Sequence, residues 1–422
     1  MTRYIAQITF ETNTPLKVGS NASDFLQDAP IQKDWNNSPM ILGTSIAGVL
    51  RKEFNESQAK SIFGDNKGSK IIFSNALLLN EINRVHEDLL LEKTPFLKIF
   101  NNLPVREHTA ITDKGVAKEH SKFDEEVVYK GTRFKFSIEV LEDEKIFNEI
   151  LEMLRQSHIR FGGGSTKGFG KFTILEIATQ EFSEENYATY SSSLNYQLKN
   201  KKALQDSNST EYTTYTLNIK PDDFYMFGSG FGDSDADMTP VYEQVIDYEN
   251  QKLSAKEILI PASSIKGALS HRTAYHYNKK MLEKGKDHTQ TVENNAAVKA
   301  IFGHKKELSE DKKTELGQKG KILISDCFQQ VNKDEVKVFD HVSIDRFTGG
   351  AIDGALFQEK TVAKNNDFTI EILLENDIDS DFNNAFENAL KDICCGMLPL
   401  GGATTKGHGV FSGEVLINGK KL

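Results

Sequence analysis

The chain has few cysteines and no long apolar run. Its three cysteines, Cys327, Cys394 and Cys395, form no C-x-x-C pair, so the sequence predicts neither a disulfide framework nor a cysteine-based zinc site. No window approaches the roughly 18 apolar residues that a membrane span needs. The first residues alternate like a strand and lack the features of a secretory signal. We therefore expect a cytoplasmic protein without a membrane partner.

Positive charge is also scarce. Lys and Arg number 51 against 61 Asp and Glu, which gives a net charge of −10. Nucleic acid held by general electrostatic attraction needs clustered cations, so any site for a polyanion must be local. A chain of 422 residues, with 38% apolar and 27% charged residues, suits two globular domains of about 200 residues.

The sequence is internally duplicated. FGGGSTKGFGKF at 161–172 aligns without a gap with LGGATTKGHGVF at 400–411. ILGTSIAGVL at 41–50 matches IPASSIKGAL at 260–269, and the region 107–140 resembles 340–374. Self-similarity of this kind indicates two copies of one structural unit. We predict a first domain at 1–180, a polar linker at 181–211 and a second domain at 212–422.

Each half shows a similar order of expected elements. A first strand (3–11, 212–220) precedes a loop and a Ser-capped helix (44–54, 263–278). A strand (70–79, 320–328), a hairpin-like insertion, a strand (133–141, 366–374), a helix (143–158, 380–395), the Gly-rich loop and a final strand follow. Two helices among at least four strands predict an α+β, ferredoxin-like unit in each half.

The Gly-rich loops are the first candidates for ligand contact. Glycine lets the backbone approach a polyanion and present N–H groups, and lysine supplies a charge. A tight helix-to-strand turn is the alternative for either copy alone. Because Lys and Thr occur in both copies, we favour ligand binding by Gly163, Thr166, Lys167, Gly168, Gly402, Thr405, Lys406 and Gly407.

The helix starts are the second candidates. Ser263, Ser264 and Lys266 fall on the first turn after Pro261, where free N–H groups and the helix dipole attract phosphate. An ordinary N-cap would also explain Ser263. The first half has Ser45 here but Ala47 in place of the lysine, and Arg51 one turn later is the expected substitute.

Acidic loops near the start of each half are the candidates for chemistry. Asp28 and Asp237 occupy equivalent positions, each closely followed by a proline. A carboxylate can hold a divalent ion against a phosphodiester, although a lone Asp in such a loop is commonly a turn former. Asp233 and Asp235 are alternatives to Asp237.

Together these residues resemble the RAMP superfamily, and within it the backbone subunits of type III CRISPR effector complexes. The resemblance rests on D-x-P-I at Asp28–Ile31, D-M-T-P-V at Asp237–Val241, GTSIAG, ASSIKG, HVSIDRFTGGAIDGALFQE at 341–359 and both Gly-rich loops. It implies two tandem ferredoxin-like (RRM-like) RAMP domains with hairpin or thumb insertions, as in type III-D-like double-backbone proteins.

The resemblance also implies a function in antiviral defence. The helix starts and Gly-rich loops would bind guide CRISPR RNA, the thumbs would wedge into the guide–target duplex with Arg346 on its backbone, and Asp28 and Asp237 would support cleavage of target RNA with Mg²⁺ or another divalent metal. Other effector subunits would be partners. Two alternatives stay open: a non-catalytic guide-binding scaffold, and a guide-processing ribonuclease using His408, whose counterpart is Phe169.

Overall fold

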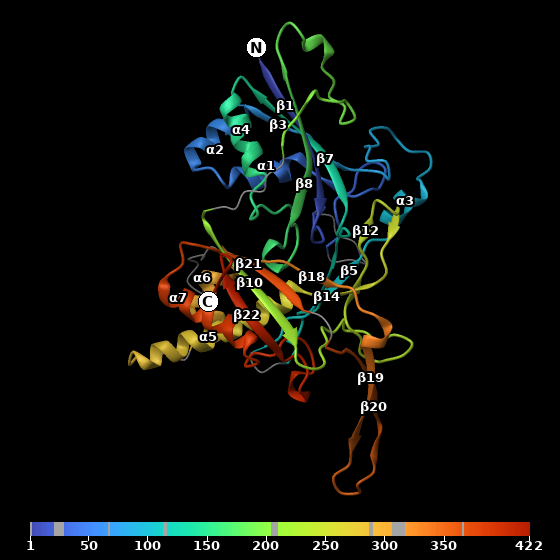
Figure 1. The fold of residues 1–422 in the computed structure, drawn as a ribbon, viewed down its shortest axis with the longest axis vertical. Coiled ribbons are helices and arrows are strands. Elements are labelled where there is room, and N and C mark those ends of the chain that lie inside the picture. The colour runs from blue at the N-terminus through green and yellow to red at the C-terminus, as the bar shows by residue number, and fades with distance from the viewer. Residues whose placement is uncertain are drawn as a thin grey trace.

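The computed structural model describes residues 2–20, 29–65, 68–112, 116–203, 210–286, 290–305, 317–364 and 367–422. Each half is built on an antiparallel sheet with helices against one face (Figure 1). No helix among these residues has the length and apolar character to cross a membrane.

The first half has the strand arrangement of a ferredoxin-like domain. Its sheet runs β2-β4-β7-β1-β8-β9, with β3 also on β7. The central strand is β1 (Arg3–Thr12), between β7 (Arg133–Leu141) and β8 (Phe172–Phe182). The other elements are β2 (Met40–Ile41), α1 (Gly43–Arg51), α2 (Glu56–Phe63), β3 (Ile71–Phe73), β4 (Ala76–Leu78), α3 (Pro95–Lys98), α4 (Glu144–Met153) and β9 (Asn200–Lys201).

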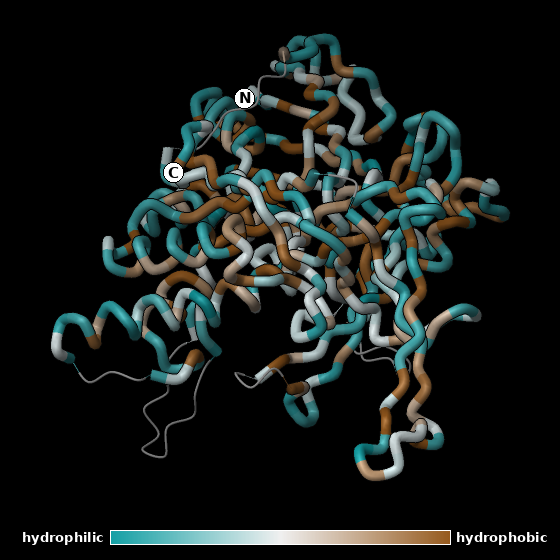
Figure 2. The backbone as a smooth tube through the Cα atoms, turned by 60° about the horizontal axis from the view of Figure 1, so that its bottom comes forward, coloured by the Kyte–Doolittle hydropathy of each residue, from teal (hydrophilic) through white to brown (hydrophobic). Residues whose placement is uncertain are grey.

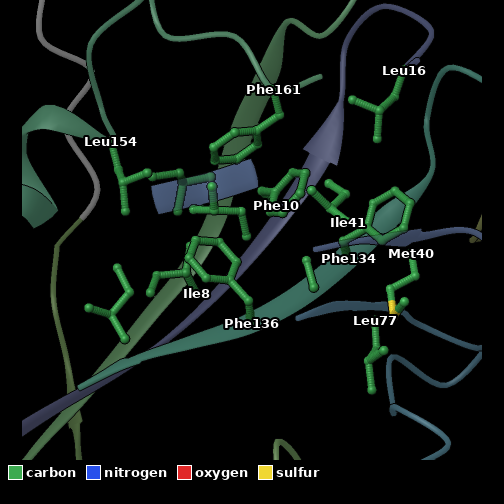
Figure 3. Packing of buried hydrophobic residues seen from close by; sticks show 14 of the residues in the cluster. Ile8, Phe10, Leu16, Met40, Ile41, Leu77, Phe134, Phe136, Leu154 and Phe161 are labelled. Carbon is green, nitrogen blue, oxygen red and sulfur yellow. The ribbon is translucent and has the colours of Figure 1, made fainter. Parts of the chain in front are cut away.

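Aromatic packing fixes the end of β1 next to the first Gly-rich loop. The ring centroid of Phe10 lies 5.3–6.0 Å from those of Phe134, Phe136 and Phe161 (Figure 3). That of Phe172 lies 5.2 Å away. Phe161, the residue before the first loop glycine, also stacks on Phe172 at 4.3 Å. Buried aromatic side chains contribute strongly to core stability, so both ends of the loop are anchored.

The segment expected to be a linker packs on the first half. Strand β9 pairs with β8, and Leu198 is buried with Ile5 and Phe182 in a small cluster. This cluster covers the sheet face that the helices leave open, which explains why both Ile5 and Ala6 of β1 are buried.

The second half repeats the arrangement. Its sheet runs β17-β21-β10-β22-β23, and α5 and α7 pack together on it. The elements are β10 (Tyr212–Pro221), α5 (Ala262–Glu283), α6 (Ala296–Phe302), β17 (Ile322–Ile324), β21 (Phe368–Glu375), α7 (Ser380–Cys394), β22 (Phe411–Ile417) and β23 (Lys420–Lys421). A smaller sheet joins β11 (Tyr242–Glu243), β14 (Glu257–Ile260) and β18 (Cys327–Gln329).

The predicted elements are found, most of them with shifted ends. The strands expected at 70–79 and 320–328 are each broken into two, and β18 joins the smaller sheet. Helices α2, α3 and α6 were not predicted. Helix α5 has 22 residues, against nine in α1.

Each half carries a hairpin where an insertion was expected. The first hairpin is β5 (Val105–His108) and β6 (Phe123–Glu126), and the second is β19 (Val336–Ile344) and β20 (Ala351–Val362). The second hairpin projects from the body (Figure 1). Two short pairs complete the fold: β12 (Ile246–Asp247) with β13 (Lys252–Leu253), and β15 (Gly303–His304) with β16 (Gln318–Lys319).

Candidate nucleic-acid interface

The Gly-rich loops are tight turns held against their own halves. Gly162 has φ +79°, and a Cβ there would collide with the carbonyl oxygen of Lys17. The N–H of Gly163 donates to that same oxygen at 2.7 Å, and the N–H of Gly402 donates to Met226 O at 2.7 Å. Our expectation that these two N–H groups face a polyanion was therefore wrong, because the fold itself uses them.

One loop glycine is buried between the halves. A Cβ on Gly168 would collide with the Asp326 carboxylate and lie 2.8 Å from the Cβ of Ala262. The equivalent Gly407 has open space around it. Gly168, predicted to bind RNA, thus packs against the second half, whereas Gly407 lies on the surface.

The helix starts also differ from expectation. Helices α1 and α5 begin at Gly43 and Ala262 with no side-chain cap from the preceding residue. The N–H of Gly43 donates to Asn75 Oδ1 at 2.9 Å, and the N–H of Ala262 donates to Asp326 Oδ1 at 2.8 Å. The predicted serine caps were wrong because these distant side chains bind the first N–H groups.

The predicted serines lie within the first helical turns instead. Ser264 is exposed, and Ser45 and Ser263 are half-buried. Arg51, the expected substitute for a first-half lysine, donates to Gly64 O at 3.0 Å and so ties α1 to the end of α2. Its guanidinium therefore serves the first-half fold.

The first loop and the α5 start meet across the halves. Lys266 Nζ donates to Thr166 Oγ1 at 3.0 Å. Burial, and then the neighbouring charge of Lys167, lower the pKa of Lys266 to about 8. Two cations and a hydroxyl from sites 100 residues apart in sequence thus form one composite site, which we call the Lys167–Lys266 site.

A buried ion cluster, here called the joint, holds this arrangement. Arg106 of β5 binds Glu243 through Nε and Nη2 and Asp326 through Nη1, at 2.5 Å for Asp326. Phe169 lies under the guanidinium at 4.9 Å from its ring centroid. Burial alone would lower the pKa of Arg106, but Asp326 and Glu243 raise it above its ordinary value. The first hairpin is therefore anchored in the second half.

A buried glutamate occupies the base of the first hairpin. Glu125 binds Lys17 and lies 3.3 Å from His108 Nε2 and 3.8 Å from Lys167 Nζ. Phe123 stacks on His108 and lies under Lys167 at 4.9 Å. Burial raises the pKa of Glu125, but hydrogen bonds from His108 and Lys17 lower it overall to about 2. The predicted phosphate ligand Lys167 thus already faces a carboxylate.

The second hairpin repeats this cluster. Glu359 is fully buried, and its carboxylate lies 3.1 Å from both Lys406 Nζ and His341 Nε2. Phe357 stacks on His341 and lies under Lys406 at 4.7 Å. His408 Nδ1 is 3.5 Å from Glu359. His408 therefore belongs to this ion cluster, where it faces a carboxylate.

The acidic loop of the second half docks on the second hairpin. Asp237 Oδ2 accepts the backbone N–H of Gln358 at 2.7 Å. Lys360 binds Asp233 at 2.6 Å and Asp235 at 3.3 Å. Asp237 is exposed. Of the three candidates it alone has no lysine partner among the described residues. Asp28 lies outside the described residues.

The described residues contain no group of three or more His, Cys, Asp and Glu side chains that could hold a metal ion. Magnesium usually keeps several waters and takes only one or two carboxylates, with phosphate oxygens completing its shell. The exposed Asp237 carboxylate fits such a partial role and would need RNA oxygens beside it.

The tip of the second hairpin is open. Arg346 is exposed, Phe347 is fully exposed, and Leu356 is 67% exposed. Apolar residues follow the hairpin away from the body (Figure 2). Exposed large apolar side chains on a projecting element mark an interaction surface.

Comparison with known proteins decides the family. A sequence model of the RAMP superfamily matches residues 9–173 and 243–412. The chain belongs to the RAMP superfamily. The two matched regions fall in the two ferredoxin-like halves, which confirms two RAMP domains in tandem.

Other comparisons are more distant. No curated protein sequence matches significantly. Among solved structures, the RAMP chain is similar to one chain in the cryo-EM structure of the type III-B Cmr-beta bound to cognate target RNA, at 17% identity and a TM-score of 0.32. The match covers 42% of the RAMP chain and 61% of that chain.

Sequence reasoning missed the buried charged residues at the two hairpins and those that join the two RAMP domains. Glu125 and Glu359 follow Phe123 and Phe357 at the same spacing in both halves, so the duplication itself carried a signal for the hairpin clusters. Arg106 had no such signal, because its partners lie more than 130 residues away.

Proposed function

We propose that this chain is a guide-RNA-binding backbone subunit of a type III-like CRISPR ribonucleoprotein. The Lys167–Lys266 site carries the proposal. In a chain of net charge −10, it brings two lysines and Thr166 together where the two RAMP domains meet. Phosphate neutralisation needs such local clustering.

The apolar and cationic second hairpin tip would contact the guide–target duplex, with Arg346 on its phosphates. Membership in the RAMP superfamily and the motifs shared with type III backbone subunits support this assignment. Guide RNA, target RNA and neighbouring effector subunits would then be the partners, in the cytoplasm.

Cleavage of the target RNA is the finer part of the proposal. A divalent ion held by Asp237, and by Asp28 in the first half, would stabilise charge on the phosphodiester. The adjacent 2′-hydroxyl would attack phosphorus. The exposure of Asp237 next to the base of the second hairpin supports its access to RNA.

The binding test uses the full chain and a single-stranded guide RNA. Lys167→Ala/Lys266→Ala should weaken binding and reduce the slope of log K against log salt by about 1.4, because each lost phosphate contact contributes about 0.7 for single strands. Lys420→Ala, an exposed lysine on β23, is the matched control. Unchanged affinity and slope in the double variant would reject the site.

The cleavage test uses end-labelled target RNA paired with guide on the same protein. Asp237→Asn should remove one of two magnesium-dependent products while RNA binding is retained. If wild-type protein binds the duplex but never cuts it, the chain is a guide-binding scaffold.

A further inference from the structure

A second cationic cavity lies between the halves, at the C-terminal end of α1. It has a volume of about 100 Å³, and Lys52, Arg160, Gly162, Tyr212, Lys319 and Glu375 are among its lining residues. None of its lining residues is a predicted RNA contact, but Ser165 directly precedes Thr166 and Lys52 directly follows Arg51, so the cavity adjoins the Lys167–Lys266 site.

Arg160 is a buried cation that forms no ion pair with a carboxylate of the described residues. The residue is only 6% exposed. Nη1 donates to Ser157 O at 2.7 Å and Nη2 to Ser325 Oγ at 3.5 Å, but no ion pair joins it to an acid among the described residues. Burial lowers the pKa of Arg160 to about 10. Arg106, by comparison, has two carboxylates.

The nearby acids already have partners. Glu53 binds His158 at 2.9 Å, and Glu375 accepts the Tyr212 hydroxyl at 3.3 Å. Glu371, beyond ion-pair distance of Arg160, binds Lys171 at 2.6 Å. The lining holds four cationic residues, Lys52, Arg160, Lys319 and Lys321, against the two carboxylates Glu53 and Glu375, so the cavity gathers more positive than negative charge. An uncompensated buried cation costs several kcal/mol as a rule, which favours a bound anion.

We propose that this cavity binds a phosphate-type oxyanion. Two of the five guanidinium N–H groups of Arg160 donate to Ser157 and Ser325, and the others are donors of the kind that suits such a group. Lys52 and Lys319, both exposed, line the cavity as further cations. A volume of about 100 Å³ exceeds the roughly 10–15 Å³ that one water molecule needs on this measure, so the cavity has room for a small oxyanion.

The site is specific to the first half. Arg160 directly precedes Phe161 and the first Gly-rich loop, and Pro399 stands at the equivalent place before Leu400. The oxyanion can come from two sources with the same chemistry: free inorganic phosphate, or a phosphodiester of bound RNA. The site itself does not depend on the proposed RNA-binding function.

The test measures thermal unfolding of the full chain against inorganic phosphate at constant ionic strength. Phosphate should raise the wild-type melting temperature, because a ligand of the native state stabilises it. Arg160→Met should lose this response yet be at least as stable as wild type in phosphate-free buffer, since it removes an unpaired buried charge. Arg155→Met, which removes an arginine already paired with Glu152, should retain the response.

A wild-type protein without a phosphate-specific shift, or an Arg160→Met variant that keeps it, would overturn the proposal. If Arg160→Met fails to fold, Lys319→Met replaces it and should weaken the phosphate response several-fold; an unchanged response would count against the site. A second arm adds guide RNA. Loss of the phosphate response on RNA binding identifies a phosphodiester as the occupant, and additive shifts identify free phosphate. Loss of RNA binding in Lys167→Ala/Lys266→Ala would reject the proposed RNA-binding function, whereas the phosphate response of the RNA-free protein reports on the Arg160 cavity.

Discussion

Removing Arg106 should destabilise the contact between the halves more than any surface change. In Arg106→Met, Glu243 and Asp326 lose their shared cation inside a site where all three side chains are at most 6% exposed. Solvent screens such charges little, and breaking a buried pair on one side costs about 3–5 kcal/mol. For a unit of about 200 residues this corresponds to a fall of roughly 10 °C in melting temperature.

Differential scanning calorimetry of the full chain measures this loss, and a charge-matched variant separates its cause. Arg106→Met/Glu243→Gln/Asp326→Asn removes the cation together with both anions. Asn at position 326 retains an oxygen for the Ala262 N–H, as Asn75 does for Gly43. The triple variant leaves no unpaired buried charge, which is the main cost of removing one partner, so it should recover most of the stability.

Two results would refute this reasoning. A cost below about 1 kcal/mol for Arg106→Met, the size of an exposed ion pair, would mean that solvent reaches the joint. A triple variant as unstable as the single variant would mean that the guanidinium acts through its packing on Phe169 rather than through charge.

Three further results are expected. RNA affinity should fall as pH rises through about 8, since Lys266 then loses its proton, and Lys266→Arg should flatten this profile in a filter-binding titration. The stabilisation from Glu125 should be complete above its ordinary pKa of 4.5 and lost as pH falls towards about 2. Urea unfolding measures this as a fall in the free energy of unfolding at acid pH, and Glu125→Gln should reduce that fall. An unchanged fall would argue against the hairpin cluster. Deleting 345–350 at the second hairpin tip should leave the melting temperature within about 1 °C, because surface changes alter stability little, but weaken guide–target duplex binding; a large loss of stability would show that the tip packs on its own half.

The sequence predicted the repeated architecture well because duplication and periodic apolar residues are local signals. Both ends of strand β7 were predicted correctly, and those of α7 to within one residue. The helix starts show the limit of such reasoning. Serine is typical of helix caps, and Ser263 lies at the start of α5. The first N–H of α5, that of Ala262, nevertheless donates to Asp326, 64 residues further along the chain. Local propensity could not reveal a cap that tertiary packing supplies.

The candidate site was predictable only in its parts. Thr166, Lys167 and Lys266 were each singled out, but the sequence placed them in separate sites, one per half. Their proximity depends on how the halves pack, which rests on Arg106 and its distant carboxylates. The unpaired charge of Arg160 was likewise invisible, since a missing partner can be recognised only once the surroundings are known.

The joint also makes the two repeats chemically different from each other. At the place of Arg106, two residues before the stacked histidine, the second hairpin has Phe339. Where Asp326 binds its helix, the first half has neutral Asn75. Two first halves in tandem would bury Arg106 without Asp326, and two second halves would bury that carboxylate without an arginine. The repeats have thus diverged into a donor and an acceptor that are no longer interchangeable, and an exchange of their order would place unpaired charge at the centre of the molecule.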